Sequence, residues 1–267
     1  MKKVVLVTYE GIYSLPLVEA FLNNKNVSVV KILKSGSIYA NLKGFRGVWF
    51  LLKRSSLLFI VPKFFENILF IIYCFFVPSA SRPFKTLAEL EQEYQIPVEV
   101  VDDVNKYDHC QHEGTVLFSS YFNQIFTEKT LSNYSQAFNI HPAPLPVGRG
   151  LFSQFWLLLK PYCEKKYYQT IHRMTSKIDD GEVVMQQSVA ASKTPASMAD
   201  YMNKVTVLGI DMMKNFDVDI DGDFHRPNES SYNSFPKAGN VLDFWCKGLS
   251  FIRYSDIRNY FKIKVPK

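Results

Sequence analysis

The sequence has few cysteines, and none of them follows a pattern that predicts a metal site or a redox centre. Four cysteines occur in 267 residues, with no Cys-x-x-Cys pair and no zinc spacing. Free thiols in a reducing cytosol fit this distribution best, so we expect neither a bound metal nor a disulfide framework. The four are Cys74, Cys110, Cys163 and Cys246.

Signals for nucleic acid binding, dinucleotide binding and secretion are also missing. The formal net charge is +6, yet no run of five Lys or Arg residues occurs, so we expect no nucleic acid partner. The turn Tyr9-Glu10-Gly11-Ile12 has one glycine and lacks the Gly-x-Gly-x-x-Gly phosphate cradle. The opening apolar run is too short for a signal peptide, and Glu10 follows it. We therefore expect a cytoplasmic protein.

What the chain does contain is an alternation of short apolar runs and helical patterns. Residues 4–8 form a β-branched run, which is typical of a parallel strand buried on both faces. Residues 15–22 have helical spacing, and residues 27–33 predict a second strand. This β-α-β opening predicts an α/β fold with a doubly wound, mostly parallel sheet. Further strands are expected at residues 98–101, 115–119, 136–140, 170–174 and 183–189, and helices at residues 86–94, 126–131 and 198–213.

The stretch most informative for function lies at the end of the strand expected at residues 136–140. Asn139 and His141 are two residues apart, so their side chains point to the same face of the sheet. Three prolines and two glycines in residues 142–150 hold the following loop in an irregular path. An open α/β sheet places its ligand crevice at the carboxyl ends of its strands. A structural Asn and His at a tight turn remains the alternative interpretation.

Residues 139–150 resemble the Asn-x-His-Pro-x-x-Leu-Pro signature of the folate-dependent formyltransferases. This family includes glycinamide ribonucleotide transformylase, methionyl-tRNA formyltransferase and the sugar N-formyltransferases. Its second signature, a hydrophobic residue and Asp-x-Gly before a strand, is matched by Ile178-Asp179-Asp180-Gly181. The resemblance covers roughly residues 1–215 and implies a formyltransferase-type, Rossmann-like domain there. A hydrophobic insert at about residues 40–85 and a small C-terminal extension at residues 216–267 would complete the chain.

The resemblance implies that Asn139, His141 and Asp179 are the catalytic residues. Attack of an amine on a formyl carbonyl creates a negative oxygen, which the Asn139 amide and a His141 N–H would bind. Asp179 would orient His141 and help to route the proton that leaves the amine. The co-substrate implied by the family is 10-formyltetrahydrofolate.

The resemblance also implies where the folate binds. In the family, a segment before the signature strand hydrogen-bonds the pterin through its backbone, and residues 122–126 correspond to it. Gln124 stands where many relatives carry Arg. We expect His172, which precedes the acidic turn, to be a structural strand histidine. The folate-binding candidates are Phe122, Asn123, Gln124, Ile125, Phe126, Ile178 and Asp180.

Elimination within the family favours an amino sugar as the acceptor of the formyl group. The chain is too short for the second, basic domain of methionyl-tRNA formyltransferase. Residues 9–13 lack the Gly-Ser-rich phosphate loop of glycinamide ribonucleotide transformylase. An amino sugar for surface polysaccharide synthesis, linked to a nucleotide or a lipid, is therefore expected. Two alternatives stay open: formylation of another small amine such as glycinamide ribonucleotide, and a formyltransferase-like protein that binds a membrane surface without catalysis.

Residues 44–78 do not fit a sheet-and-helix pattern, because they contain three runs rich in aromatic and aliphatic side chains. No run reaches the roughly 20 apolar residues that span a bilayer, and we expect Pro62 to break a helix that joins two of them. Interleaved basic residues are typical of helices in a membrane interface. Two interpretations of this segment stay open, and the first is slightly favoured. It packs on the sheet or forms a homodimer interface, or it makes peripheral membrane contact or receives a lipid-linked amino sugar. The basic residues are Arg46, Lys53, Arg54 and Lys63.

Overall fold

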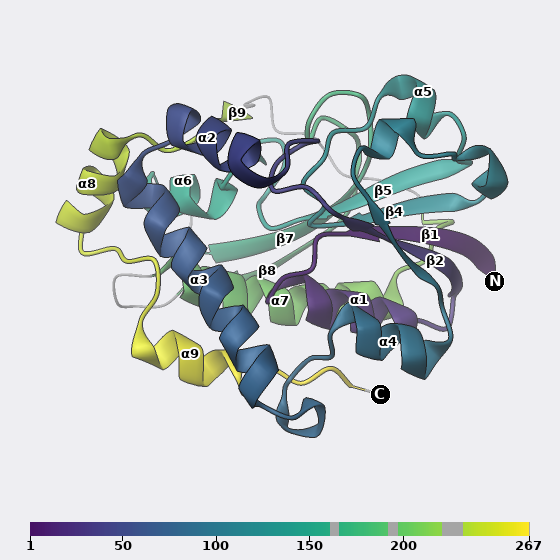
Figure 1. Cartoon of the computed structure of the whole chain (residues 1–267), viewed down its shortest axis with the longest axis horizontal. Coiled ribbons are helices and arrows are strands. Elements are labelled where there is room, and N and C mark those ends of the chain that lie inside the picture. Colours follow the sequence, from purple (N-terminus) through teal and green to yellow (C-terminus); the bar gives the residue numbers. More distant parts are fainter. Residues whose placement is uncertain (161–165, 192–196, 221–231, 267) are drawn as a thin grey trace.

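A central sheet organises the chain. A computed structural model describes residues 1–160, 166–191, 197–220 and 232–266, and in this part the sheet has seven strands in the order β3-β2-β1-β4-β5-β7-β8 (Figure 1). The pairs from β3 to β5 are parallel, whereas β7 and β8 are antiparallel. The predicted α/β fold with a mostly parallel sheet is therefore confirmed. Cys163 lies outside the described residues. The strands are β1 Lys2–Thr8, β2 Val27–Ser35, β3 Val98–Val101, β4 Val116–Ser120, β5 Gln136–His141, β7 Lys166–Arg173 and β8 Val183–Ala190.

One face of the sheet is covered by α1 (Ser14–Leu22), α4 (Leu87–Tyr94), α7 (Met198–Asn215) and α9 (Tyr254–Tyr260). Their apolar side chains pack with inward residues of six strands into the largest core cluster. α4 begins with the capping box that its sequence indicates, because Thr86 and Glu89 exchange hydrogen bonds between side chain and backbone. These four helices therefore support the sheet, from whose strand ends the loops extend.

The opposite face is covered mainly by loops and by the short α5 (Glu128–Leu131). Val104, Phe126 and Tyr134 pack there against Val7 and other residues of the sheet. The helix predicted from residue 126 begins two residues later, because Phe126 is buried in the loop that precedes it. Short 3-10 turns lie at Ser79–Ser81, Val104–Lys106 and Cys110–His112.

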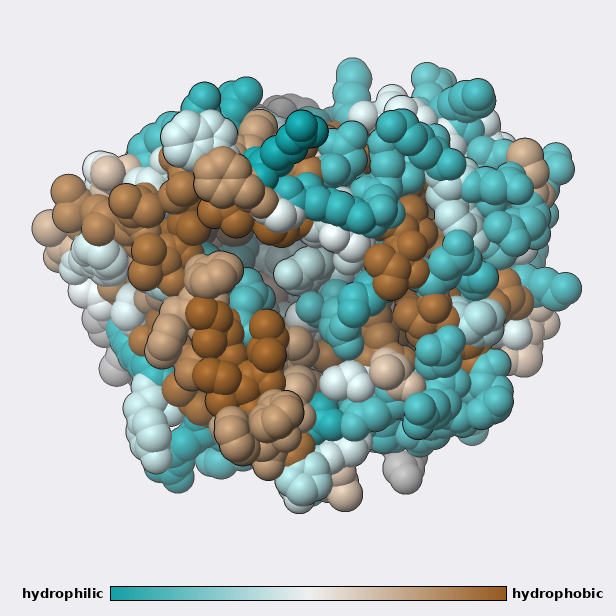
Figure 2. Space-filling model, in the orientation of Figure 1, coloured by the Kyte–Doolittle hydropathy of each residue, from teal (hydrophilic) through white to brown (hydrophobic). Residues whose placement is uncertain are grey.

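The hydrophobic insert forms a helical pair, α2 (Gly44–Arg54) and α3 (Leu57–Phe76), at the front of the molecule in Figure 1. The expectation that Pro62 breaks the second helix was wrong, since α3 runs through it. Proline has no N–H, so it removes the bond to the Leu58 carbonyl, but the bonds of the other turns remain. Within the described residues, α3 is the helix long and apolar enough to cross a membrane, and 6% of its apolar window is buried. Figure 2 shows a broad hydrophobic area over it.

The segment after α7 packs back onto the main body. β9 (Tyr232–Asn233) pairs with β6 (Arg149–Gly150). α8 (Ala238–Cys246) packs with α3 and α6 (Ser153–Leu159) in a second cluster, where Phe59 of α3 contacts the rings of Phe155 and Phe251. Tyr260 joins the main core. This C-terminal segment therefore anchors the N-terminal half of α3 to the rest of the chain.

Candidate active site

Asn139 and His141 line a cavity at the carboxyl ends of the parallel strands. β5 ends at His141, and the cavity is also lined by Tyr9 and Tyr121, which directly follow β1 and β4. Its volume is about 690 Å³. An open α/β sheet binds its ligands at this position. The shared face of Asn139 and His141, expected from their spacing, is confirmed.

Asp179 reaches the same cavity from the turn between β7 and β8. Its φ is +49°, a left-handed conformation that few residues other than glycine adopt. The backbone N–H of Gly150 donates a 2.9 Å hydrogen bond to Asp179 Oδ2 and so holds the carboxylate. A Cβ added at Gly181 would lie 1.6 Å from the carbonyl oxygen of Arg173 in β7. The Asp-x-Gly pattern therefore has a steric reason, because only glycine fits this close to the neighbouring strand.

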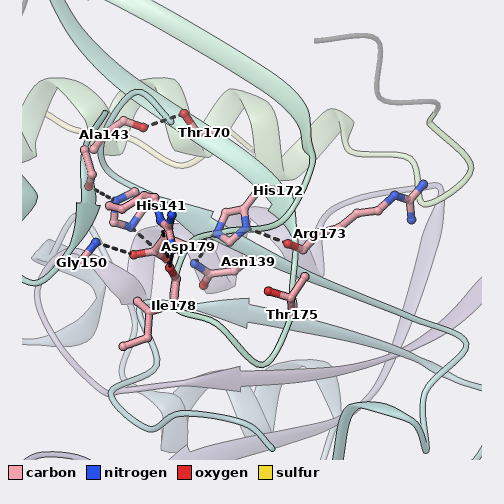
Figure 3. A network of polar contacts seen from close by, with 12 residues as sticks. Asn139, His141, Ala143, Gly150, Thr170, His172, Arg173, Thr175, Ile178 and Asp179 are labelled. Atoms are coloured by element: carbon pink, nitrogen blue, oxygen red, sulfur yellow. Dashed lines mark hydrogen bonds and ion pairs between the residues drawn. The ribbon is translucent and has the colours of Figure 1, made fainter. Parts of the chain in front are cut away.

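The His141 ring lies beside the Asp179 carboxylate (Figure 3). Nδ1 of His141 is 3.7 Å from Asp179 Oδ1, which is longer than a hydrogen bond but within the range of an ion pair. Nε2 of His141 lies 2.8 Å from the carbonyl oxygen of Gly148, to which it donates its hydrogen. Nδ1 is consequently the ring nitrogen left to face Asp179 and a ligand.

His172 takes part in the same network. It is a buried residue of β7, as expected of a structural strand histidine, and its Nε2 is 3.0 Å from Asn139 Nδ2 and 3.6 Å from Asp179 Oδ1. Its Nδ1 donates a 2.8 Å hydrogen bond to the carbonyl oxygen of Arg173. With the ring hydrogen on Nδ1, Nε2 accepts from the Asn139 amide. His172 thus bonds Asn139 and lies beside Asp179, although sequence reasoning gave it no part in the site.

The surroundings of Asp179 shift the pKa of its carboxyl group strongly. Burial alone would raise its pKa, but His141, His172 and the backbone N–H of Gly150 together hold the pKa well below the ordinary value. Asp179 is therefore a carboxylate at neutral pH. The site therefore holds a fixed negative charge in contact with two imidazole rings.

The predicted folate segment, residues 122–126, lines the cavity in full. Its side chains have structural roles: the Gln124 amide bonds the backbone of Val104 and the hydroxyl of Ser35, and the Asn123 amide nitrogen bonds the carbonyl oxygen of Ser37. Within the described chain, the buried Oδ1 of Asn123 has no hydrogen-bond partner. The segment therefore forms one wall of the cavity, and the Asn123 and Gln124 side chains hold it to the neighbouring loops.

The two remaining folate candidates differ in position. Ile178 lines the cavity, and its carbonyl oxygen accepts a 3.1 Å hydrogen bond from the Arg149 guanidinium. Asp180 is absent from the cavity lining that the described residues form, and its carboxylate pairs with Arg149 at 2.6 Å. Of the two adjacent acids, only Asp179 points inward.

One wall of the cavity was missed from the sequence. Residues of α3, among them Phe59, Lys63 and Asn67, line it opposite the sheet, so the hydrophobic insert is part of the site rather than a separate appendage. Lys63 pairs with Glu66 of the same helix. The signal that could have revealed this wall is the polar triplet of Lys63, Glu66 and Asn67 within an otherwise apolar helix, since such groups turn away from a hydrophobic surface.

A family model for formyl transferases matches residues 79–214, which is more than half of the chain. The matched range contains Asn139, His141, His172 and Asp179. Over 123 residues, the chain is 28% identical to the bifunctional polymyxin resistance protein ArnA of Wigglesworthia glossinidia brevipalpis. The aligned part is 44% of this chain and 18% of that protein, so the match spans less than a fifth of the relative's length.

Solved structures share the fold. A sugar N-formyltransferase from a Shewanella species has a TM-score of 0.54 and 16% identity, with 89% of this chain and 78% of that one covered. An N-formyltransferase from Helicobacter canadensis, in complex with folinic acid and dTDP-3-aminofucose, has a TM-score of 0.52 and 14% identity, with 88% and 71% covered. At such low identity these similarities establish the architecture of the sheet and its helices.

Proposed function

Because the chain belongs to the formyl transferase family, we propose that it transfers a formyl group from 10-formyltetrahydrofolate to the primary amine of an amino sugar. The observation that carries this proposal is the convergence of Asn139, His141 and an ionised Asp179 in one cavity. A binding protein without catalysis would have no need of a buried carboxylate held beside two histidines.

Asn139 binds the oxygen that becomes negative as the amine attacks the formyl carbon. Its amide carries two N–H groups, and His172 accepts one of them, so the second is available to this oxygen. One such donor is worth about 3–4 kcal/mol of transition-state stabilisation in other acyl-transfer enzymes. His172 fixes which end of the amide faces the reaction.

His141 and Asp179 manage charge and protons. Since Nε2 of His141 is bound to Gly148, Nδ1 is the nitrogen that donates to the oxyanion or exchanges a proton. Asp179 orients His141 and helps to route, through water, the proton that leaves the amine as the new C–N bond forms. The bond between the formyl carbon and the carrier nitrogen then breaks, and that nitrogen takes up a proton.

The cavity suits a folate co-substrate, which supplies the formyl carbon as an electrophile. A volume of about 690 Å³ lies within the range of small-molecule sites. Residues 122–126 all line the cavity, and their backbone would supply the hydrogen-bonding groups for a heterocycle. Phe122 and Phe126, whose ring centroids are 5.5 Å apart, provide an apolar wall beside them.

An amino sugar is the acceptor class that the loop after β1 and the comparisons favour. Glu10 of that loop pairs with Lys34 and accepts the backbone N–H of Leu87, so an acid stands where a phosphate-binding loop would need donors. This weakens the case for glycinamide ribonucleotide. The Helicobacter canadensis neighbour was solved with an amino sugar on a nucleotide, which supports the same class here.

The test is an acceptor panel with the purified chain and 10-formyltetrahydrofolate, followed by the change in folate absorbance. The panel holds nucleotide-linked and lipid-linked amino sugars and glycinamide ribonucleotide. We expect turnover with an amino sugar that falls at least about 100-fold in His141→Ala. Turnover with glycinamide ribonucleotide alone would establish the alternative acceptor. Failure to bind folinic acid by calorimetry, together with no turnover, would contradict catalysis altogether.

A further inference from the structure

The outer side of α3 is an apolar face without a partner in the described chain. Its exposed side chains recur at intervals of three and four residues along the whole helix, and Phe75 is 83% exposed. Figure 2 shows this face as a continuous hydrophobic area beside a hollow. Patches of this kind are rare on monomeric soluble proteins and mark interaction sites. The exposed residues are Leu57, Leu58, Val61, Phe64, Phe65, Ile68, Ile71, Ile72, Phe75 and Phe76.

α2 adds aromatic residues and positive charge to this face. Phe45 and Trp49 are exposed, and their rings stack at 6.1 Å. The helix carries Arg46, Lys53 and Arg54 and no acidic residue, and these three have no carboxylate partner within the described ranges. Lys53 lies instead over the ring of Trp49, at 5.2 Å from its centroid. Tryptophan beside basic residues is the combination that favours the headgroup layer of a membrane.

The inner side of α3 is bound to the protein. Phe59 is buried among aromatic rings, Tyr73 stacks on Phe261 with a centroid distance of 4.6 Å, and Lys63 and Glu66 pair beside the cavity. A helix of 20 residues is about 30 Å long, which would suffice to cross a bilayer. Crossing would break these contacts and bring Lys63, Glu66 and Asn67 into hydrocarbon. The helix is therefore arranged to lie in the plane of a surface.

We propose that α2 and α3 dock this protein on an anionic phospholipid bilayer. The outer face of α3 lies in the acyl boundary, and Arg46, Lys53 and Arg54 of α2 contact the headgroups. Phe64 and Ile71 are both exposed and part of the cavity lining, so the cavity mouth adjoins the docked face. A lipid-linked acceptor could enter the site from this side.

Charge complementarity selects the bilayer over a second copy of the chain. Residues 43–85 contain seven basic side chains and one acidic side chain, and that acid, Glu66, is already paired. Asp243 of the adjoining α8 pairs with Lys247. A face with unpaired cations and no free acid repels its own copy, whereas anionic headgroups neutralise it.

Flotation in a sucrose gradient tests the proposal. Vesicles of equal parts phosphatidylcholine and phosphatidylglycerol are expected to carry the intact chain upward, and pure phosphatidylcholine vesicles are expected to carry much less. Raising the salt concentration should weaken the binding. The double variant Phe65→Glu, Phe75→Glu should bind at least about 10-fold more weakly, and Arg46→Glu, Lys53→Glu should lose the preference for anionic lipid. None of these residues lines the cavity in the described chain.

The matched control is Val207→Glu, which places the same charge at an exposed apolar position of α7. It should bind vesicles as the parent does, and equal weakening would overturn the assignment of the face. Three further results would overturn the proposal. They are no flotation with anionic vesicles, resistance of the bound protein to alkaline carbonate extraction, and a lipid-free dimer that Phe65→Glu, Phe75→Glu dissociates in sedimentation.

Discussion

Asn139 and His172 face each other across the antiparallel pair of β5 and β7, with the amide nitrogen of one 3.0 Å from Nε2 of the other. Residues that stand opposite in such a pair have side chains on the same face of the sheet. Because the hydrogen on Nδ1 of His172 is held by the Arg173 carbonyl, Nε2 is an acceptor. The histidine therefore orients the Asn139 amide, so that its second N–H group can point toward a ligand in the cavity.

His172→Phe should remove this acceptor while it keeps a ring in the strand. The Asn139 amide would then rotate more freely, and we expect kcat to fall on the order of 10-fold or more with little change in the KM for folate. His172→Gln, which restores an acceptor oxygen, should recover part of the loss. Steady-state kinetics of the three proteins decide this, and an unchanged kcat in His172→Phe would show that the histidine only fills space.

Asp179→Asn should abolish most turnover, because the variant keeps the shape of the side chain but loses the charge opposite His141. We expect kcat to fall on the order of 100-fold or more. Asp180→Asn is the matched control, since that acid pairs with Arg149 and has no place in the described cavity lining. Its kcat should stay within about 3-fold of the parent. Equal losses in the two variants would contradict the assignment of Asp179.

The lowered pKa of Asp179 makes a prediction about stability. A carboxyl whose pKa is lower in the folded than in the unfolded chain stabilises the fold above its unfolded pKa of about 3.9. This contribution is lost as the pH falls towards the folded pKa. The difference in free energy of unfolding between the parent and Asp179→Asn should therefore shrink below about pH 4. Urea titrations from neutral pH to pH 2 measure it, and a constant difference over that range would contradict the shift.

Gly181→Ala should destabilise the fold severely. Its Cβ would meet the carbonyl oxygen of Arg173 at 1.6 Å, and backbone on both sides must move to relieve the clash. We expect a loss of about 2 kcal/mol or more in the free energy of unfolding. Gly239→Ala is the control, because a Cβ there meets no atom within 4 Å and alanine favours the helix. Thermal unfolding should separate the two, and equal melting temperatures would refute the steric argument.

The order of strands and helices could largely be predicted from the sequence, because local patterns carry it. The β-branched run at the start, the helical spacing before Leu22 and the capping box at Thr86 each depend on residues within a few positions of one another. The sequence did not predict α6, α8 and α9, and α3 is a further exception. Pro62 looked like a helix breaker, but one missing hydrogen bond did not outweigh the packing of Phe59 and Tyr73 on either side of it.

The sequence by itself determined the local geometry of the proposed catalytic groups. The strand period places Asn139 and His141 on one face, and the Asp-x-Gly turn admits only glycine at position 181. Only the tertiary structure decided which other residues contact those groups. His172 faces Asn139 because β5 and β7 pair in one register, and α3 walls the cavity because Phe59 is held by rings of residues far along the chain. Such contacts depend on how distant segments pack, and no local pattern encodes them.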